Sequence, residues 1–140
     1  MKILLAADGS KYTRHAVNYL IKNLRMFGPK PDIHLLTVHV PLPGRAARFV
    51  DRATMRDYYE ETCRKALAGA KRLLDARHVP YKEVHMIGDP GEAIARYARK
   101  GKFSLVIMGS HGHGALTSLV LGSAANKVLA SCKVPVLIVR

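Results

Sequence analysis

The succession of short apolar runs and amphipathic segments limits the folds open to this chain more than any other feature of its sequence. Runs rich in Val, Ile and Leu are typical of buried strands, whereas apolar residues at helical spacing are typical of helices that cover a sheet. Parallel strands need such crossover helices. The alternation therefore predicts an α/β fold, with an open parallel sheet and helices on both of its faces. The predicted strands span residues 3–7, 33–40, 81–87, 103–108 and 135–140.

The segments between these strands carry start and stop signals for helices. Ser10 is suited to cap a first helix, whose apolar stripe runs on to Phe27. Turn residues and basic residues predict a loop over 41–51, and apolar residues at helical spacing predict a long helix over 52–77. The remaining two helices are expected to begin near Pro90 and Ser123.

A glycine-rich stretch follows the fourth predicted strand. It begins Met108-Gly109-Ser110-His111-Gly112, and after a short interval Gly122-Ser123 opens a helical pattern. Glycine lets the main chain approach a ligand closely, and the free N–H groups at a helix start favour an anion. Gly109, Gly112, Gly122 and Ser123 are therefore candidates for a phosphate-binding loop. The alternative is an ordinary loop that ends in a serine cap.

This stretch differs from the two common phosphate-binding motifs. A Walker loop needs Lys after its second glycine, where this chain has His113 after Gly112. A dinucleotide fingerprint follows the first strand rather than the fourth. The spacing of the glycines alone thus leaves the kind of anion open.

The expected topology points to the same region. In a sheet of order 3-2-1-4-5, the first and fourth strands are neighbours, and the winding of the chain reverses between them. Ligands bind outside the carboxyl ends of the strands at such a reversal. The first strand runs into Asp8 and the fourth into Gly109, so polar and flexible residues meet at this edge.

The composition excludes several classes of protein. The 140 residues are 49% hydrophobic and 24% charged, which predicts a single globular domain over 1–140 rather than a disordered chain. No apolar run is long enough to span a membrane, and Asp8 lies too early for a signal peptide, so we expect a cytoplasmic protein. Cys63 and Cys132 fall in helical patterns without ligand-like spacing, and we expect buried, reduced thiols.

The chain is strongly basic. Its formal net charge of +13, from 23 Lys and Arg against 10 Asp and Glu, favours anionic partners such as nucleotides, nucleic acid, acidic proteins or lipid head groups. The basic residues are dispersed rather than gathered in one run, which makes nucleic acid an unlikely partner. A basic interaction protein with no bound nucleotide stays an alternative.

The whole chain resembles the universal stress protein family. The resemblance rests on the start of the chain through Asp8-Gly9-Ser10, on Gly88-Asp89-Pro90, on Leu105 through Ser123, and on the closing run from Cys132 to Arg140. The nucleotide-binding branch of that family has glycine, two residues, glycine, nine residues, then glycine and Ser or Thr. Gly109, Gly112 and Gly122-Ser123 match this spacing completely. The resemblance implies strand order 3-2-1-4-5, an ATP or AMP ligand, and a homodimer joined through the last strands, 136–140.

The resemblance also implies a role for individual residues. Gly109, Gly112, Gly122 and Ser123 match the phosphate loop, with His111 inside it. Asp8 matches an acid near the ribose and any phosphate-bound metal such as Mg²⁺; the alternative is a local cap on the first helix. Val38 matches the position whose backbone meets adenine, and plain core packing is its alternative. Ser104 departs from the acid that the family often has before its fourth strand. The candidate nucleotide-binding residues are Ala7, Asp8, Val38, Met108, Gly109, His111, Gly112, Gly122, Ser123 and Ala124.

These features predict a stress-response protein that binds an adenine nucleotide and acts as a sensor or binding module. His111 and His113 beside Ser110 admit nucleophilic catalysis, but we expect them to line an anion site. No paired carboxylates lie near the loop and no general base is evident. Slow hydrolysis of a nucleotide, or nucleotidyl transfer, by an enzyme of the same fold is the alternative.

Overall fold

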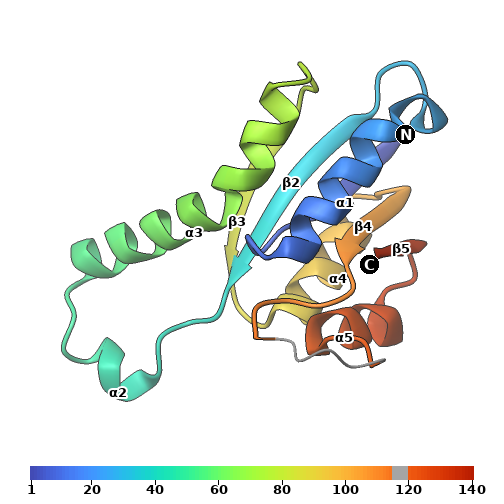
Figure 1. Cartoon of the computed structure of the whole chain (residues 1–140). Coiled ribbons are helices and arrows are strands. Elements are labelled where there is room, and N and C mark those ends of the chain that lie inside the picture. The colour runs from blue at the N-terminus through green and yellow to red at the C-terminus, as the bar shows by residue number, and fades with distance from the viewer. Residues whose placement is uncertain (115–119) are drawn as a thin grey trace.

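Five parallel strands form the centre of the molecule (Figure 1). The computed structural model describes residues 1–114 and 120–140. The sheet has the order β3-β2-β1-β4-β5, as predicted. The strands are β1 (Lys2–Ala6), β2 (Asp32–His39), β3 (Lys82–Ile87), β4 (Leu105–Gly109) and β5 (Val136–Val139).

Helices cover both faces of this sheet. They are α1 (Lys11–Lys22), the 3₁₀ helix η1 (Leu24–Phe27), α2 (Gly44–Ala47), α3 (Arg52–Asp75), α4 (Pro90–Lys100) and α5 (Ser123–Ser131). Residues of α1 and α3 pack on one face, around Ile3 and Leu5 of β1. Residues of α4 and α5 pack on the other face, around Leu4 and Val106. Because successive side chains of a strand point to opposite faces, central β1 is buried throughout its apolar run.

The helix α3 is only partly supported by the sheet. Its second half buries Cys63, Leu67, Ala70 and Leu74, whereas its first half extends past the end of β2 (Figure 1). Met55, which belongs to the same apolar stripe, stays half-buried. The first half of α3 therefore leaves the sheet near the carboxyl ends of the strands.

Several details differ from the prediction. The first helix ends at Lys22 because the Asn23 side chain donates to the Tyr19 carbonyl at 2.9 Å, and a separate 3₁₀ turn continues to Phe27. Segment 41–51 contains the one-turn helix α2. The strand predicted from 103 begins at Leu105. Cys132 lies just after α5 in an extended conformation and is half-buried rather than helical and buried.

Candidate functional site

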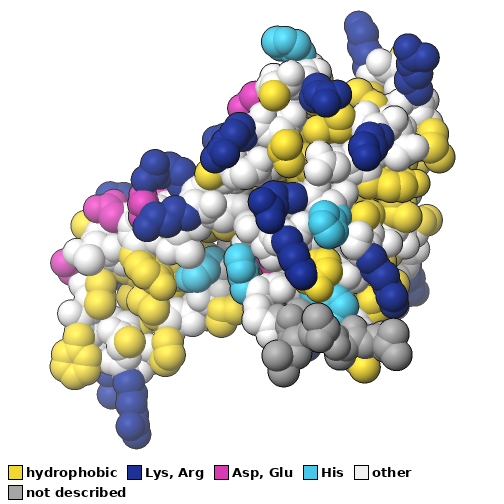
Figure 2. All heavy atoms as spheres, viewed as in Figure 1, with side chains coloured by type: hydrophobic (Ala, Val, Ile, Leu, Met, Phe, Trp, Pro, Cys, Tyr) yellow, Lys and Arg dark blue, Asp and Glu magenta, His cyan; other side chains and the backbone are white. Residues whose placement is uncertain are grey.

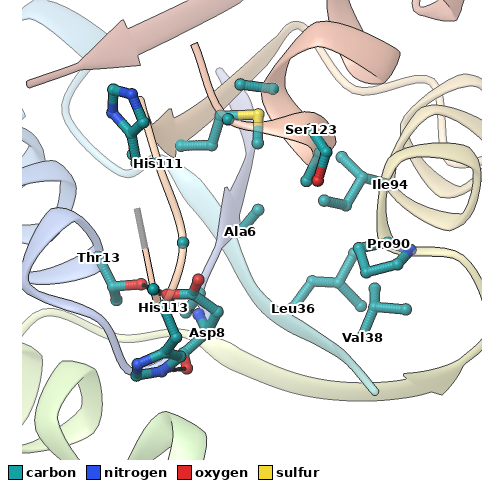
Figure 3. A pocket seen from close by; sticks show the side chains of 18 residues that line it. Ala6, Asp8, Thr13, Leu36, Val38, Pro90, Ile94, His111, His113 and Ser123 are labelled. Carbon is teal, nitrogen blue, oxygen red and sulfur yellow. Dashed lines mark hydrogen bonds between the residues drawn. The ribbon is translucent and has the colours of Figure 1, made fainter. Parts of the chain in front are cut away.

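A cavity of about 330 Å³ lies at the carboxyl ends of β1 and β4, on the face of the sheet that α4 and α5 cover (Figure 3). This is the point at which the winding of the sheet reverses. All ten residues predicted for the nucleotide site line it: Ala7, Asp8, Val38, Met108, Gly109, His111, Gly112, Gly122, Ser123 and Ala124. The fold therefore brings together residues from β2, from the end of β4, from the segments that follow β1 and β4, and from the start of α5.

Asp8 is held by the turn between β1 and α1. Its Oδ1 accepts from the backbone N–H of Ser10 at 2.9 Å and from the Thr13 hydroxyl at 2.7 Å. The cap of α1 is Ser10, whose hydroxyl accepts from the Thr13 backbone N–H. Asp8 thus orders the turn without capping the helix, and its carboxylate lines the cavity (Figure 3).

Each of the three glycines of the loop allows a different close approach. A Cβ on Gly109 would lie 2.6 Å from the Cβ of Tyr12 and 2.8 Å from its carbonyl carbon, so this glycine lets α1 pack against the end of β4. A Cβ on Gly112 would lie 2.8 Å from Asp8 Oδ2, so this glycine brings the loop up to the carboxylate. The Gly122 N–H donates to the Ser110 carbonyl at 2.8 Å and closes the loop on itself.

Two histidines tie this loop to its surroundings. His111 Nε2 donates to the carbonyl of Val120, because a carbonyl can only accept. The other ring nitrogen, Nδ1, lies 2.9 Å from the Ser110 hydroxyl. His113 Nε2 donates to the Asp8 carbonyl at 2.7 Å. Ser110 is 0% exposed, so its hydroxyl cannot reach a substrate in the cavity.

The opposite wall of the cavity is apolar. Leu36 and Val38 contribute from β2, and Pro90 and Ile94 from α4 (Figure 3). Sequence reasoning named only Val38 from this group. The alternation along β2 places Leu36 on the same face, so that signal was available for Leu36. The approach of α4 that adds Ile94 depends on packing between helices and has no comparable signal.

The helix α5 begins at this cavity without a capping side chain. Each of the helices α1, α3 and α4 is capped by its own side chain, from Ser10, Asp51 and Asp89 respectively. At α5 the N-cap is Gly122, and no side chain of the described residues accepts from its first turn. Ser123, Ala124 and Ala125 line the cavity, and the first N–H groups of a helix have no intrahelical acceptor.

An ion pair holds α5 against α4. Lys127 Nζ lies 2.6 Å from Asp89 Oδ2, and the Lys127 ammonium holds the pKa of Asp89 below its usual value. The helices also approach closely, since a Cβ on Gly91 would lie 2.4 Å from the Cβ of Lys127. The start of α5 is thus fixed relative to the apolar wall that α4 supplies.

Oxygen ligands for a metal ion are few in this region. Asp8 supplies the one carboxylate among the described residues that line the cavity. No group of three or more His, Cys, Asp or Glu side chains in 1–114 and 120–140 could hold a metal. Such a site fits Mg²⁺ only together with ligand phosphates and water, which is the usual mode for that ion.

The sheet order and the cavity at its switch point define a doubly wound α/β fold, in which this position is the usual place for a ligand. The model of the universal stress protein family matches residues 1–140, so the chain belongs to this family. No helix among the described residues is long and apolar enough to cross a membrane.

Three known proteins illustrate the likeness. A universal stress protein of Thermus aquaticus is 32% identical over 145 residues, covering 99% of this chain and 97% of that protein. A universal stress protein in complex with cAMP has a TM-score of 0.74 at 20% identity, covering 100% of this chain and 97% of that one. An Arabidopsis thaliana family protein with AMP bound has a TM-score of 0.65 at 16% identity, covering 99% and 90%. The two solved structures support the fold.

Proposed function

We propose that this protein binds an adenine nucleotide, ATP or AMP, in the cavity at the ends of β1 and β4. The uncapped start of α5 carries the proposal, because its free N–H groups and the positive end of its dipole meet a glycine loop in a cavity. The volume of about 330 Å³ falls in the range of small-molecule sites. Similar structures with cAMP and with AMP support the choice of an adenine nucleotide.

The two walls of the cavity suit the two ends of such a ligand. The adenine ring is expected against Leu36, Val38 and Ile94, where it loses contact with water. The phosphates are expected at Gly112, Gly122 and Ser123, and the ribose beside Asp8. Mg²⁺ would be held by Asp8 together with phosphate oxygens, where it would neutralise part of their charge.

The protein is proposed to act as a cytoplasmic sensor or binding module in a stress response. Ser110 and His111 lie within hydrogen-bond distance, but the serine is fully buried. We therefore expect hydrolysis far below ordinary enzyme rates of about 1–10³ s⁻¹. Metal-dependent phosphate release at such rates, lost on Asp8→Asn, would instead favour a hydrolase or a nucleotidyl-transfer enzyme.

We further propose that two copies associate through β5. This strand is an edge of the sheet, and an apolar edge is open to pairing unless something covers it. Pairing with its own copy about a two-fold axis would satisfy both edges in one contact.

Isothermal titration of the purified protein with ATP, AMP and cAMP tests the binding proposal directly. We expect saturable binding of at least one of these nucleotides. Absence of binding by all three, in a protein that melts cooperatively, would overturn the proposal and favour a basic interaction protein. Mass spectrometry of ligand released from the protein provides an independent check.

A further inference from the structure

A second cavity lies on the other face of the sheet, where α3 passes the carboxyl end of β2. It has a volume of about 450 Å³. Its lining comes from the turn after β1, from the end of β2 (Thr37–Val40) and from one turn of α3 (Thr62–Ala66, without Arg64). Asp8, Val38 and His113 line both cavities. The second cavity exists because α3 is anchored at Leu67 and beyond but leaves the sheet toward its start (Figure 1).

Two deeply buried polar side chains line this second cavity. Thr37 is 3% exposed and Cys63 is 2% exposed. Among the described residues, neither the Thr37 hydroxyl nor the Cys63 thiol has a hydrogen-bond partner. A hydroxyl without a protein partner is normally satisfied by water where water can reach it. The Thr37 hydroxyl is not among the buried atoms that lack a partner, so water in the cavity reaches it, and a ligand there would take the place of that water.

Lys65 brings an ammonium group to the lining of this cavity. Among the described residues, Lys65 forms an ion pair with Glu61 alone, one turn earlier in α3, at 3.4 Å and largely exposed. Such a surface pair is weak and can yield to a better acceptor. Thr62 donates its hydroxyl to the Tyr58 carbonyl, and His39 packs edge-on against the rings of Tyr58 and Tyr59. His113 is engaged with the Asp8 carbonyl.

The remaining wall is apolar and closely packed. Val38, Val40 and Ala66 supply much of it, and the space beside Gly9 is closed because a Cβ there would lie 3.1 Å from the Ala66 carbonyl oxygen. Asp8 is the one acid among the described residues of this lining, and its Oδ1 already accepts hydrogen bonds from Ser10 and Thr13. The anionic end of a ligand would therefore lie toward Lys65, and its apolar body against Val40 and Ala66.

We infer that this second cavity binds a small organic carboxylate with a compact apolar body, whose carboxylate meets Lys65 and the Thr37 hydroxyl. A metal ion fits poorly, because no group of three metal-binding side chains occurs among the described residues. A nucleotide fits poorly too, because the described residues that line this cavity include neither a glycine loop nor an open helix start. Asp8, Val38 and His113 line both cavities, but Thr37, Cys63 and Lys65 line the second and not the first, and the inference rests on these residues rather than on the proposed nucleotide site.

Titration of ¹⁵N-labelled protein with benzoate, followed by amide chemical shifts, tests the inference. Saturable shifts are expected within 37–40 and 62–66 at roughly millimolar benzoate, and weaker ones with the neutral isostere benzamide. Adding AMP to a second sample should instead shift amides at 108–112 and 122–124. Failure of the AMP arm alone would overturn the nucleotide proposal and leave the second site standing.

Two variants locate the carboxylate. Thr37→Val keeps the shape and removes a hydroxyl that has no partner, so the fold should be as stable as before while benzoate binds about five- to tenfold more weakly. Lys65→Met should weaken benzoate at least as much, whereas Lys22→Met, a matched change on α1, should leave it unaltered. Benzoate that shifts no amide in 37–40 and 62–66, or that binds Thr37→Val as well as wild type, would show that the cavity holds only water.

Discussion

The structure gives Gly109 a different role from the one that the sequence predicts. Its place in the glycine spacing suggests contact with phosphate, but in the structure it makes room for Tyr12. We predict that Gly109→Ala lowers the free energy of unfolding by about 1–3 kcal/mol, as overpacking does. Gly69→Ala is the control: nothing lies within 4 Å of its added Cβ in the middle of α3, so stability should rise by about 0.5–1 kcal/mol. Urea unfolding of both variants measures the contrast, and equal effects would contradict it.

Ser123 allows a test that separates helix stability from ligand binding. An acid in the first turn of α5 favours the helix dipole by about 0.3–1 kcal/mol but repels a phosphate placed there. Ser123→Asp is therefore expected to melt at the same temperature or higher, and to bind AMP at least about tenfold more weakly. Ser123→Ala is the neutral control and should bind within a few-fold of wild type. Undiminished AMP affinity in Ser123→Asp would contradict the proposed position of the phosphate at the start of α5.

A substitution at Gly112 tests whether the glycine loop binds the phosphate. A side chain here meets the Asp8 carboxylate and fills the space between loop and strand. Gly112→Val should remain folded, because Gly112 does not have a positive φ, but it should lose nucleotide binding. Calorimetry on a variant with native circular dichroism checks this. Wild-type affinity in such a protein would sink the phosphate-loop proposal.

His34 should make the stability of the protein depend on pH. It is 9% exposed, and its Nδ1 lies 3.0 Å from the Tyr97 hydroxyl. Its Nε2 lies 3.5 Å from Asp32 Oδ1 and makes no hydrogen bond with the described residues. Burial lowers its pKa from 6.5; Asp32 opposes this shift, whereas Lys2 and Lys82 add to it. The unfolded chain therefore takes up the proton first, so the contribution is complete above pH 6.5 and is lost as the pH falls below it.

Thermal melts measure this contribution. Between about pH 7.5 and about pH 5.5 the wild type should lose stability, and His34→Gln should lose less because the buried imidazole is gone. His15→Gln, at an exposed position on α1, should behave like the wild type. An unchanged pH dependence in His34→Gln would assign the effect to other groups.

At the scale of elements, periodicity and turn chemistry predicted the sheet well. All five strands were predicted, four from short apolar runs and β3 from a more polar segment, and Ser10 marked the start of α1 correctly. Hydrogen bonds from side chains to the helix backbone were not predicted. At the end of α1, for example, the Asn23 side chain donates to the Tyr19 carbonyl and the helix ends early. The ten predicted site residues do surround one cavity, but their role in binding stays a prediction.

What the sequence could not show is where helices stop touching the sheet. The second cavity depends on the angle at which α3 leaves β2, which is set by the packing of Leu67, Ala70 and Leu74 together rather than by any one of them. Alternation along β2 does place Thr37 opposite Val38. It cannot tell whether a helix covers that threonine.

The backbone hydrogen bonds of β5 suggest a test of whether two copies pair through this strand. The Pro135 and Val139 carbonyls accept from β4, so these positions face the sheet, and Ile138 presents its N–H to the free edge. Ile138→Pro should therefore remove an edge donor without breaking the ladder to β4, and yield monomers. Leu137→Pro should break that ladder and lower the melting temperature as well. Light scattering at micromolar concentration measures the mass; a monomeric wild type, or a dimeric Ile138→Pro, would contradict pairing through β5.

At the scale of the whole molecule, charge is unevenly distributed along the chain. All ten acids lie between Asp8 and Glu92, so the glycine loop, α5 and β5 carry none. Lys and Arg are spread over the face seen in Figure 2. We predict that raising NaCl from about 50 mM to about 500 mM weakens ATP binding more than AMP binding, because ATP carries the larger charge and screening grows with salt. Parallel titrations compare the two slopes, and equal slopes would argue against a long-range electrostatic contribution.

The two edge strands of the sheet, β3 and β5, differ in a way that affects whether more than two copies could assemble. β3 presents Lys82, Glu83 and His85, with Glu83 paired to Lys71 and to His85, whereas β5 is apolar through Val136–Val139. Charged side chains on an edge discourage a further strand from adding. Two copies joined at β5 would expose only β3 edges at either end, so the assembly would terminate itself. A substitution that made β3 apolar would remove that stop, and the same sheet could then extend from molecule to molecule into a fibre.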